Sequence, residues 1–596
     1  MGDWSRAHIC QCLNRLLTLR GNSTVTIAQE QRKSGEQFVE SVLSLAHKLC
    51  QLGLCRGQIV AICAFNSDSY LEWLLAVAYI GGIIAPLNYR WAYRYTSEIE
   101  STWSMKSESL EESKVALEVI RPAMIVTDEC CTWLSDLRNG TMFCPRWHVS
   151  VGFHYSTSNG IQECERLSIN LQSIKYCWAP DNVVIICFTS GSTGKPKGVA
   201  ISHASLIMQS LAKIAIVGYA EDDVYLHTAP LCHIGGISSC ISMLMVGGCH
   251  VLIPKFEVKM ALKAIEENHV TSFITVPAML ASLVSTMRNN KSRNLVESVK
   301  KILNGGGSLS LQLVEDSVRC FHRAKLLSAY GMTETCSSLT FITVYDPAIN
   351  NRHLKKIRGT VSNSVHPIGG ICVGKPAPHV ELLVIKEELS HVGRIMTRGL
   401  HVMIGYWGQI SGLEIDSSGD WFDTGDSGHI DAHGNLWLVG RRNCRIKSGG
   451  ENVYPEEVEV VLSQHPGILA VVVIGLPDAH LGEMVVACVQ IRDNWIWTDL
   501  NVGELQSNME RHLSTGMLKE FCRHKSLTGS LSVSLFFHSP SPCSKQIRKL
   551  KSLWFKIPRA FMIWRKPFPL TSTGKVKRDQ VKAEAISHLQ PFFSNL

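Results

Sequence analysis

Residues 183–199 read VVIICFTSGSTGKPKGV, and they decide how the rest of the chain is interpreted. The first five residues are apolar, which predicts a short buried strand. The following residues 189–198 hold three glycines, four hydroxyl residues and two lysines. A loop of this composition can turn backbone N–H groups inward and surround an anion with donors and positive charge. The stretch therefore predicts a strand followed by a phosphate-binding loop, called the phosphate loop below.

The phosphate loop differs from a Walker-type loop, whose pattern is G-x-x-x-x-G-K-[ST]. Thr189 stands five positions before Gly194, where that pattern requires a glycine, and Pro196 follows Lys195 in place of a hydroxyl residue. The structural alternative is a solvated Gly/Ser linker, which the apolar stretches on both sides disfavour. We therefore predict phosphate binding, but not a Walker-type NTPase.

Composition limits the class of protein. At 596 residues the chain is too long for one core, so two or more domains are expected. A hydrophobic fraction of 45% and a charged fraction of 18% are typical of a globular enzyme. The net charge of +8 suits an anionic substrate, and without a dense Lys/Arg tract we expect no nucleic-acid partner. The 21 cysteines form no C-x-x-C pair, which predicts buried free thiols in a reducing compartment.

Membrane and targeting signals are weak. Residues 73–89 and 224–254 lack charge, but glycines and prolines interrupt them, so we predict core elements and no transmembrane segment. Residues 4–29 contain three arginines and no acidic residue, which is typical either of a transit peptide or of an amphipathic helix that opens the fold. The chain ends Ser594-Asn595-Leu596, one residue away from the peroxisomal S-K-L address. The predicted location is the peroxisome, the chloroplast or both.

Apolar strands alternate with helical patterns up to about residue 410, which predicts an α/β fold with largely parallel sheets. A smaller pattern restarts near residue 440. We therefore expect a large N-terminal domain of layered α/β subdomains (1–440) and a small α+β C-terminal domain (441–596). The predicted strands span residues 59–64, 124–127, 183–188, 271–276, 301–304, 470–474 and 485–491, and the predicted helices span residues 70–80 and 455–462.

Five further motifs supply candidate binding residues in addition to the phosphate loop. Glycines after a strand let a planar ring or a phosphate approach the backbone. An aromatic residue offers stacking, and a carboxylate pairs with the vicinal hydroxyls of a ribose or with a cation. The motifs are NGGG (304–307), AYGMTET (329–335), WFDTGD (421–426), GRRNCRIKSGGENVYPEEVE (440–459) and PLTSTGKVKR (569–578).

In this order the motifs resemble those of the adenylate-forming ligases, which include acyl-CoA synthetases, 4-coumarate-CoA ligases, luciferases and peptide-synthetase adenylation domains. The resemblance covers nearly the whole chain. It implies a large N-terminal domain and a small, mobile C-terminal domain. It also implies ATP and Mg²⁺ as cofactors in converting a carboxylic acid to an acyl-adenylate and pyrophosphate, after which coenzyme A displaces AMP.

The resemblance assigns a role to each motif. The phosphate loop would hold the β- and γ-phosphates, the glycines and the tyrosine would enclose adenine, and an aspartate and an arginine would hold the ribose. The residues expected to bind ATP are Thr189, Ser190, Gly191, Ser192, Thr193, Gly194, Lys195, Gly198, Gly305, Gly306, Gly307, Tyr330, Gly331, Met332, Thr333, Asp426, Arg441 and Lys575.

Four of these motif residues are expected to be catalytic. Thr333 would contact the α-phosphate, and Glu334 would bind Mg²⁺. Lys575 would bridge the substrate carboxylate and the α-phosphate in the first half-reaction. Lys447, otherwise a solvated surface lysine, would serve the second half-reaction after the small domain rotates. The hinge position, commonly Asp or Lys in the family, is Asn443, which tolerates the unusual φ/ψ values of a hinge.

Finer resemblances to particular members of the family predict which acid is activated. His233 in APLCHIGG stands where the family often gates the acyl pocket, although a hydrogen-bonded core histidine is an equal alternative; His203 is expected to be structural. The stretches IKSGGENVYPEEVE, FPLTSTGKVKRDQV and LNYRW look like the succinylbenzoate-CoA ligases of phylloquinone and menaquinone synthesis, particularly the plant form. The alternatives are another aromatic or medium-chain acyl-CoA synthetase, a carrier-loading module, and a non-catalytic homologue.

Two segments fit this scheme badly. Residues 93–105 add a polar, aromatic piece before a predicted helix, and residues 530–554 combine Ser-rich, Pro-containing and Lys-rich sequence. Compact domains rarely contain such long connections. Joining Gly529 to Phe555 would restore LTGFKIP, so we predict that residues 530–554 are an insertion foreign to the working enzyme.

Overall fold

The computed structural model describes residues 7–91, 103–128, 145–152, 176–190, 196–289, 296–350, 370–386, 391–408, 421–449, 451–498, 511–531, 556–570 and 576–593. By its internal contacts the chain divides into two compact units. Unit 1 comprises Met1–Ile357, Val373–Leu382 and Thr397–Phe422; unit 2 comprises Arg358–Cys372, Leu383–Met396 and Asp423–Leu596. The domain limits 1–440 and 441–596 stay a prediction.

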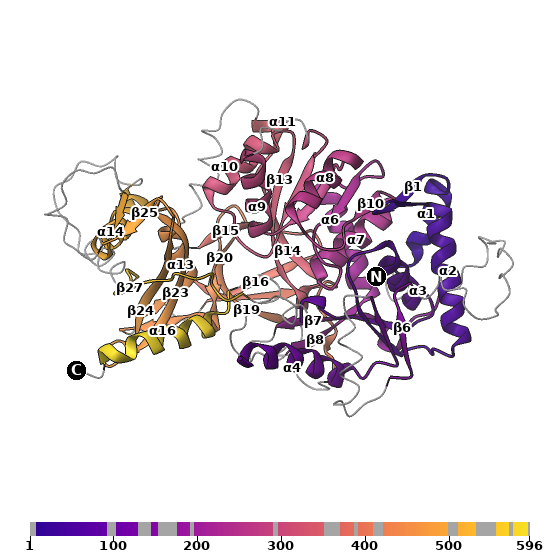
Figure 1. Ribbon diagram of the computed structural model, residues 1–596, viewed down its shortest axis with the longest axis horizontal. Helices are drawn as coiled ribbons and strands as arrows, with labels where there is room; N and C mark the ends of the chain where they lie inside the picture. The colour runs from indigo at the N-terminus through magenta and orange to yellow at the C-terminus, as the bar shows by residue number, and fades with distance from the viewer. Residues whose placement is uncertain are drawn as a thin grey trace. The chain divides into compact units, whose positions relative to one another are not determined.

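One sheet of unit 1 confirms the predicted parallel arrangement (Figure 1). Its inner strands pair in parallel, because long apolar runs allow both faces to be covered by helices. An antiparallel strand flanks them on each side, and one of these strands, Ser337–Tyr345, continues the sheet by pairing with Ile371–Pro376. The strands, in spatial order, are β14 (Ser337–Tyr345), β13 (Lys325–Met332), β12 (Lys301–Asn304), β11 (Ser272–Thr275), β9 (Val224–His227), β10 (Cys249–Leu252), β1 (Thr24–Ala28) and β2 (Gln31–Ser34).

A second sheet of unit 1 carries the phosphate loop. In spatial order its strands are β18 (Gly405–Tyr406), β8 (Pro196–Ser202), β7 (Val183–Ser190), β4 (Ile83–Pro86), β3 (Ile59–Cys63), β5 (Met124–Thr127) and β6 (Trp147–Ser150). The β7–β8 pair is an antiparallel hairpin. Pairing with β8 extends β7 to Ser190, two residues beyond the predicted end of this strand.

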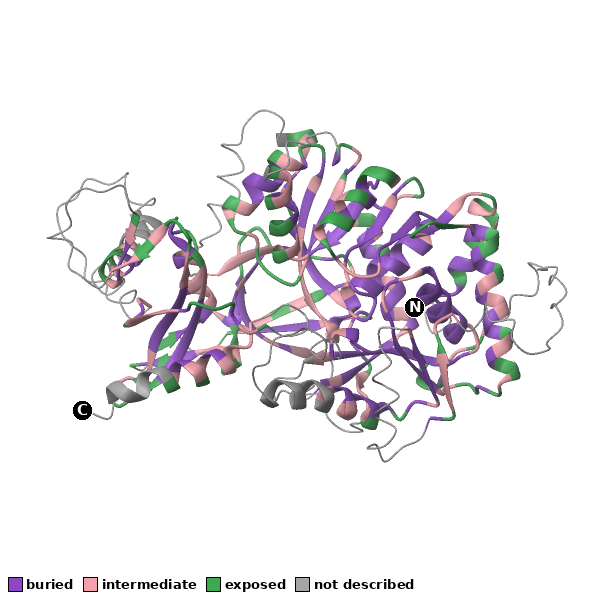
Figure 2. Ribbon diagram, viewed as in Figure 1, coloured by how far each residue is buried: buried purple, intermediate pink, exposed green. Residues whose placement is uncertain are grey.

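Helices cover these sheets, and Figure 2 shows buried strands beside helices whose outer faces are exposed. The first helix, α1 (Gln11–Arg20), buries Leu13 and Leu16 in the main core, so it belongs to the folded unit. α3 (Asp68–Tyr79) is buried at nearly every position, which explains why its sequence carries no charge from Trp73 onward. The other helices of unit 1 are α2 (Gly35–Gln51), α4 (Trp103–Ile120), α6 (His203–Lys213), α7 (Ile234–Val246), α8 (Val258–Asn268), α9 (Pro277–Asn289), α10 (Leu311–Cys320) and α11 (Pro347–Asn350).

Unit 2 is α+β, as predicted. β23 (Ile468–Asp478) and β24 (Gly482–Ile491) form a long antiparallel pair, flanked by β21 (Ile446–Ser448), β22 (Glu451–Val453) and β27 (Ala560–Ile563). α13 (Pro455–Leu462) has the predicted limits and buries Val458 and Leu462 against this sheet. The remaining elements are the β19 (Phe422–Ile430) and β20 (Leu436–Arg441) hairpin, β25 (Trp495–Trp497), β26 (Arg511–Leu513), α14 (Thr515–Leu531) and α16 (Arg578–Phe593). Strands β15 (Ile371–Pro376), β16 (Glu381–Lys386) and β17 (Gly393–Arg398) lie in segments where the two units alternate along the chain.

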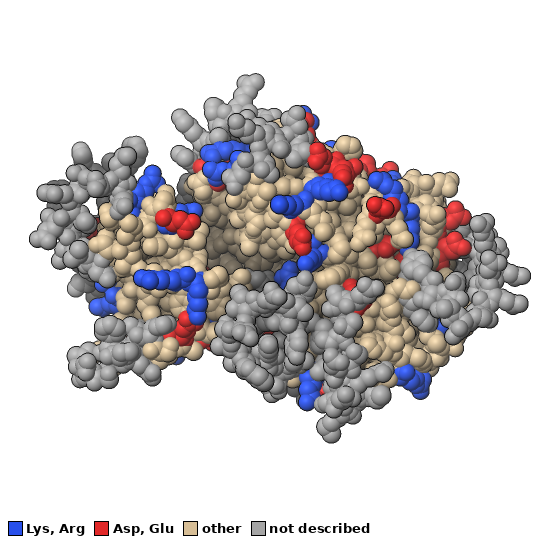
Figure 3. Space-filling model, viewed as in Figure 1, with Lys and Arg blue, Asp and Glu red and all other residues tan. Residues whose placement is uncertain are grey.

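Charge and thiols follow the expected pattern in the described part of the chain. On the face shown in Figure 3, basic and acidic side chains are interspersed over a largely uncharged surface. The described cysteines are all free, and most of them are buried, although Cys50, Cys55 and Cys177 are exposed. None of the described helices combines the length and the apolar character needed to cross a membrane.

The suspected insertion lies almost wholly outside the described residues, as does residue range 93–102 of the other unusual segment. The chain on both sides of the insertion belongs to unit 2, since α14 precedes it and β27 follows it to pair with β24. Looping out such a segment costs little closure entropy, so the fold could tolerate it.

Deleting residues 530–554 is expected to keep or improve soluble yield and pyrophosphate release. The reason is that the deletion removes the apolar LSVSLFF run, which favours aggregation, and leaves β27 in the sheet. Expression yield, thermal melting and pyrophosphate release measure the effect, with a deletion of β27 as a control that should unfold the small sheet. Unfolding or inactivity of the 530–554 deletion would show that the segment is an integral element.

Candidate active site

The phosphate loop is closed at its base by the β7–β8 hairpin. Thr189 pairs with Lys197, and Ser190 pairs with Pro196, so both ends of the loop are held by strand hydrogen bonds. Gly198 lies opposite Phe188, one step further along the hairpin. Residues 191–195 lie outside the described residues, so their phosphate-binding role stays a prediction.

Residues 403–407, which sequence reasoning missed, connect the phosphate loop to Glu334. Tyr406 pairs with Val199 on β8, and its ring lies 4.9 Å from the Lys197 ammonium. The Tyr406 hydroxyl donates a hydrogen bond of 3.0 Å to Glu334 Oε1, and the Met403 N–H donates one of 2.8 Å to the Glu334 carbonyl. The strand therefore places the expected metal ligand beside the loop base.

Glu334 lies in a single 3₁₀ turn, Thr333–Thr335, that follows β13. The buried Thr335 hydroxyl accepts a hydrogen bond from the Met332 N–H at 3.3 Å, and Cys336 adopts a left-handed conformation (φ 53°), so the turn is sharply defined. Glu334 is half-buried and pairs with no basic side chain among the described residues. Its second carboxylate oxygen suits Mg²⁺, which prefers hard oxygen ligands.

The expected adenine site is built at the ends of two parallel strands. Gly305–Gly307, called the glycine loop below, follows β12, and Tyr330 lies near the end of the adjacent β13. Carboxyl ends of parallel strands commonly form ligand sites in α/β folds. Gly305 has open space where a Cβ would point, and Gly306 has φ +71°. Tyr330 is partly buried against an apolar cluster that includes Leu303 and Leu327, which supports its ring.

Gly331 has a packing reason for being glycine. A Cβ at this position would lie 1.6 Å from the Ser337 carbonyl oxygen, because β13 and β14 approach closely there. Any side chain would push the two strands apart and shift the neighbouring Tyr330 and Thr333.

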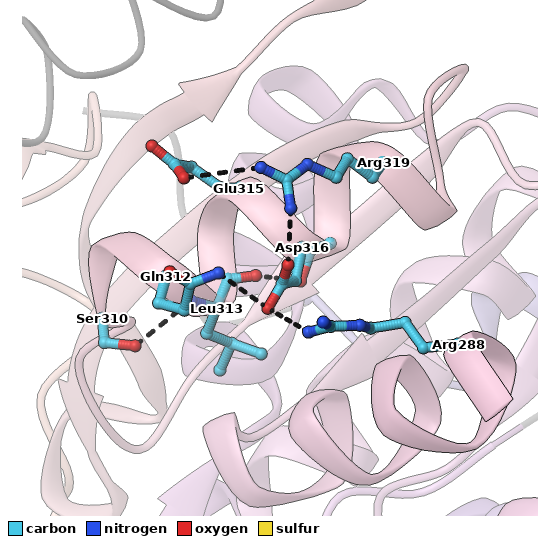
Figure 4. Close-up of polar contacts among 8 residues, drawn as sticks. Arg288, Ser310, Gln312, Leu313, Glu315, Asp316 and Arg319 are labelled. Atoms are coloured by element: carbon cyan, nitrogen blue, oxygen red, sulfur yellow. Dashed lines mark hydrogen bonds and ion pairs between the residues drawn. The ribbon is translucent and has the colours of Figure 1, made fainter. Parts of the chain in front are cut away.

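The helix after the glycine loop is anchored by polar contacts (Figure 4). Ser310 caps α10 by accepting a hydrogen bond from the Leu313 N–H at 3.2 Å. Buried Asp316 accepts a hydrogen bond of 2.9 Å from Arg288 of α9 and one of 3.1 Å from Arg319. These contacts tie α10 to α9 and hold the C-terminal end of the glycine loop.

The expected ribose ligands meet in unit 2. Asp426 and Arg441 are direct neighbours across the β19–β20 hairpin, with Arg441 Nε 3.5 Å from Asp426 Oδ1. Asp426 is buried, whereas Arg441 is about half exposed. A neighbouring ion pair joins Arg442 Nη2 to Asp423 Oδ2 at 2.8 Å, which fixes the chain just before the expected hinge.

The hinge residue and the second lysine are both exposed. Asn443 lies in a short 3₁₀ turn, Arg442–Cys444, between β20 and β21. Lys447 lies on β21, where its N–H donates a hydrogen bond of 2.9 Å to Glu483 Oε2 while its side chain faces solvent. A solvent-facing position fits both a lysine that a moving domain presents and an ordinary surface lysine.

Lys575 lies outside the described residues, but both ends of its loop are held. Leu570 forms a β-bridge with Val576, and the Lys577 N–H donates a hydrogen bond of 2.8 Å to the Pro569 carbonyl. The loop that carries Lys575 therefore starts and ends at a fixed point of unit 2.

Arg578, which sequence reasoning did not single out, anchors this loop. Its guanidinium forms ion pairs with Glu459 and, at 3.2 Å, with Glu456, both on α13. Contact with Glu459 raises the pKa of Arg578 against the opposing effect of burial. The signal in the sequence was the acidic pair of PEEVE at i, i+3 spacing, which places both carboxylates on one helix face.

The two singled-out histidines differ in position. Half-buried His233 occupies the N-cap of α7, so the gating role and the core role both stay open. His203 is buried, accepts a hydrogen bond from the Ile9 N–H at 3.3 Å and stacks on His8. Burial lowers the pKa of His203 to about 2, as suits a neutral structural histidine.

A second buried cluster, His227, Cys240 and His250, has ligand atoms within 4.8 Å of one another. His227 Nε2 and His250 Nδ1 form a hydrogen bond of 2.9 Å, and burial lowers the pKa of both imidazoles. A neutral, hydrogen-bonded histidine pair accounts for this cluster, although His250 Nε2 has no hydrogen-bond partner among the described residues.

The fold and the site define an ATP-dependent, adenylate-forming enzyme. Residues 17–407 match the family model described as AMP-binding enzyme, and residues 457–527 match the AMP-binding enzyme C-terminal domain. The chain therefore belongs to the AMP-binding enzyme family.

Individual members of the family are similar to this chain over most of its length. The chain is 48% identical over the full length of both chains to 2-succinylbenzoate–CoA ligase, chloroplastic/peroxisomal, of Arabidopsis thaliana. It is 29% identical, over 81% of this chain and 88% of the relative, to indoleacetate–CoA ligase of Aromatoleum aromaticum. Its fold matches the o-succinylbenzoate CoA synthetase of Bacillus subtilis in complex with an acyl-adenylate intermediate, with a TM-score of 0.70, 23% identity, and 96% and 97% of the two chains covered.

Proposed function

We propose that the chain is an ATP- and Mg²⁺-dependent 2-succinylbenzoate–CoA ligase of naphthoquinone biosynthesis. The observation that carries the proposal is the 48% identity along the whole chain to a ligase of that name. The chain also carries the phosphate loop, the TET turn and both lysines, the motifs that the resemblance assigns to this reaction. A location in chloroplasts and peroxisomes, as printed for that relative, is part of the proposal.

The first half-reaction joins a carboxylate oxygen to the α-phosphorus of ATP, and the bond from that phosphorus to pyrophosphate breaks. Both reactants are anionic, so the chain's main task is to place positive charge and donors around the pentacovalent phosphorus. Glu334 would hold Mg²⁺, which neutralises phosphate charge, and Thr333 would donate to the α-phosphate. Lys575 would contact both reacting groups, which stabilises the charge that they share in the transition state.

In the second half-reaction the coenzyme A sulfur attacks the acyl carbonyl, and the bond to AMP breaks. The resemblance assigns Lys447 to this step after unit 2 turns about Asn443. Arg442, held by Asp423 just before the hinge, and Arg578, held by α13 just after Lys575, would keep each lysine on a rigid support. Such positioning accounts for much of the rate gained in group transfer.

Thioester formation is expected to favour 2-succinylbenzoate over 4-coumarate, indoleacetate and hexanoate by about 100-fold or more in kcat/KM. A site built to bind a buried second carboxylate is left with unpaired polar groups by an acid that lacks it. Initial rates of coenzyme A thioester formation across these acids measure the preference. Faster turnover of 4-coumarate or hexanoate would instead assign the chain to another aromatic or medium-chain acyl-CoA synthetase.

A further inference from the structure

Lys213, at the end of α6, carries a buried charge that the reaction scheme above does not use. Its side chain is fully buried, and it is the only buried lysine or arginine among the described residues. Nζ donates hydrogen bonds to Ser238 Oγ at 2.6 Å and Ser239 Oγ at 3.1 Å, both on α7. No carboxylate lies within ion-pair distance of it in the described part of the chain.

Other buried charges in unit 1 do have partners. Glu72 is paired with Lys33 at 2.6 Å, and Asp223 is paired with Lys301 at 2.6 Å. Burying an ammonium group without a counter-ion lowers the stability of the fold by several kcal/mol. An apolar side chain would fill a purely structural position without this cost. Two serine hydroxyls orient Lys213 but do not neutralise it.

Lys213 also has a neighbour that lies next to the TET turn. Its near neighbour Cys336 follows the TET turn directly. Cys187 of β7 is within electrostatic reach of both Cys336 and Glu334, and its thiol faces the Cys232 carbonyl, at 3.7 Å, just before His233. The strand of the phosphate loop, the TET turn, the start of α7 and Lys213 therefore converge in one region of unit 1.

We propose that Lys213, held by Ser238 and Ser239, binds the second carboxylate of the substrate, the one that is not activated. This inference rests on the proposed function and names the residue that would give it its specificity. A dicarboxylate would supply the missing counter-ion, whereas a monocarboxylate of the same shape would leave the ammonium group buried and unpaired.

Among the titratable groups around Lys213, only Lys213 itself changes charge near neutral pH. Burial lowers the pKa of Lys213 to about 7, and Cys336 acts in the opposite direction. Burial raises the pKa of Cys336 to about 12 and also raises that of Tyr225, which lies on β9 near Ser239. Lys213 is therefore charged below pH 7 and loses its proton above it, while both neighbours stay neutral.

The test compares Lys213→Met with the native enzyme on two acids of one skeleton. These acids are 2-succinylbenzoate and 4-oxo-4-phenylbutanoate, which lacks the second carboxylate. Lys213→Met is expected to lower kcat/KM for succinylbenzoate about 100-fold and to leave that for 4-oxo-4-phenylbutanoate unchanged or higher. An unchanged preference in the variant, or an equal loss for both acids, would overturn the role of Lys213.

A second measurement uses only the native enzyme. It tests the role of Lys213 even if Lys213→Met does not fold. The ratio of kcat/KM values for the two acids is expected to be highest below pH 7 and to fall as Lys213 loses its proton above it. A ratio that is flat from pH 6 to pH 9 would contradict the inference. If the native enzyme shows no preference for succinylbenzoate at pH 6.5, the proposed function itself is wrong.

Discussion

Replacing Lys575 with alanine is expected to lower the rate of acyl-adenylate formation by about 100- to 1,000-fold. The loss of one preorganised hydrogen-bond donor to a transition state has an effect of this size in other enzymes. The lysine would contact the substrate carboxylate and the α-phosphate only while the bond between them forms. Thioester formation from a supplied acyl-adenylate should stay within a few-fold of the native rate. Pyrophosphate release and single-turnover thioester formation measure the two half-reactions separately.

Lys447→Ala is the matched control, because it removes an exposed lysine of the same unit. It is expected to show the opposite bias, with adenylation largely kept and thioester formation reduced. Equal losses in both half-reactions for both variants would contradict the assignment of one lysine to each conformation.

Glu334→Gln is expected to reduce pyrophosphate release by about 100-fold and to raise the Mg²⁺ concentration needed for half-maximal rate. Glutamine keeps the size of the side chain and its contact with Tyr406 but removes the charge that attracts the cation. A Mg²⁺ titration of pyrophosphate release measures the effect, and thermal melting shows whether the fold is kept.

Tyr406→Phe separates the charge of Glu334 from its orientation. It removes only the hydroxyl that donates 3.0 Å to Glu334, so a loss of less than about 10-fold is expected, as for one neutral hydrogen bond. Losses of similar size in both variants would mean that orientation, rather than metal binding, explains the role of Glu334.

The sequence predicted those elements whose pattern is set locally. β5 and β12 have the predicted limits because a run of apolar residues between turns fits a strand that is buried on both faces. α13 was equally clear, since Pro455 opens it and two glutamates occupy its first turn. Phosphate binding by residues 189–198 was predicted from their composition, and the roles in the TET turn were implied by the family resemblance; both stay predictions.

Features that depend on packing between distant segments could not be predicted. Lys213 is the last residue of an amphipathic helical pattern, a position where a solvated lysine is usual. It is buried because α6 packs on α7. Tyr406 reaches Glu334 because β18 pairs with β8, from which it is separated by about 200 residues. For α1, the sequence indicated an amphipathic pattern, and the structure shows that its Leu13 and Leu16 are buried in the main core.

The central claim is that this chain activates 2-succinylbenzoate as an acyl-adenylate before coenzyme A takes part. Isotope exchange between pyrophosphate and ATP, measured without coenzyme A, tests it most directly. We expect exchange that requires both Mg²⁺ and 2-succinylbenzoate and that is lost in Lys575→Ala but kept in Lys447→Ala. Exchange that proceeds without the acid, or that appears only when coenzyme A is added, would contradict the claim.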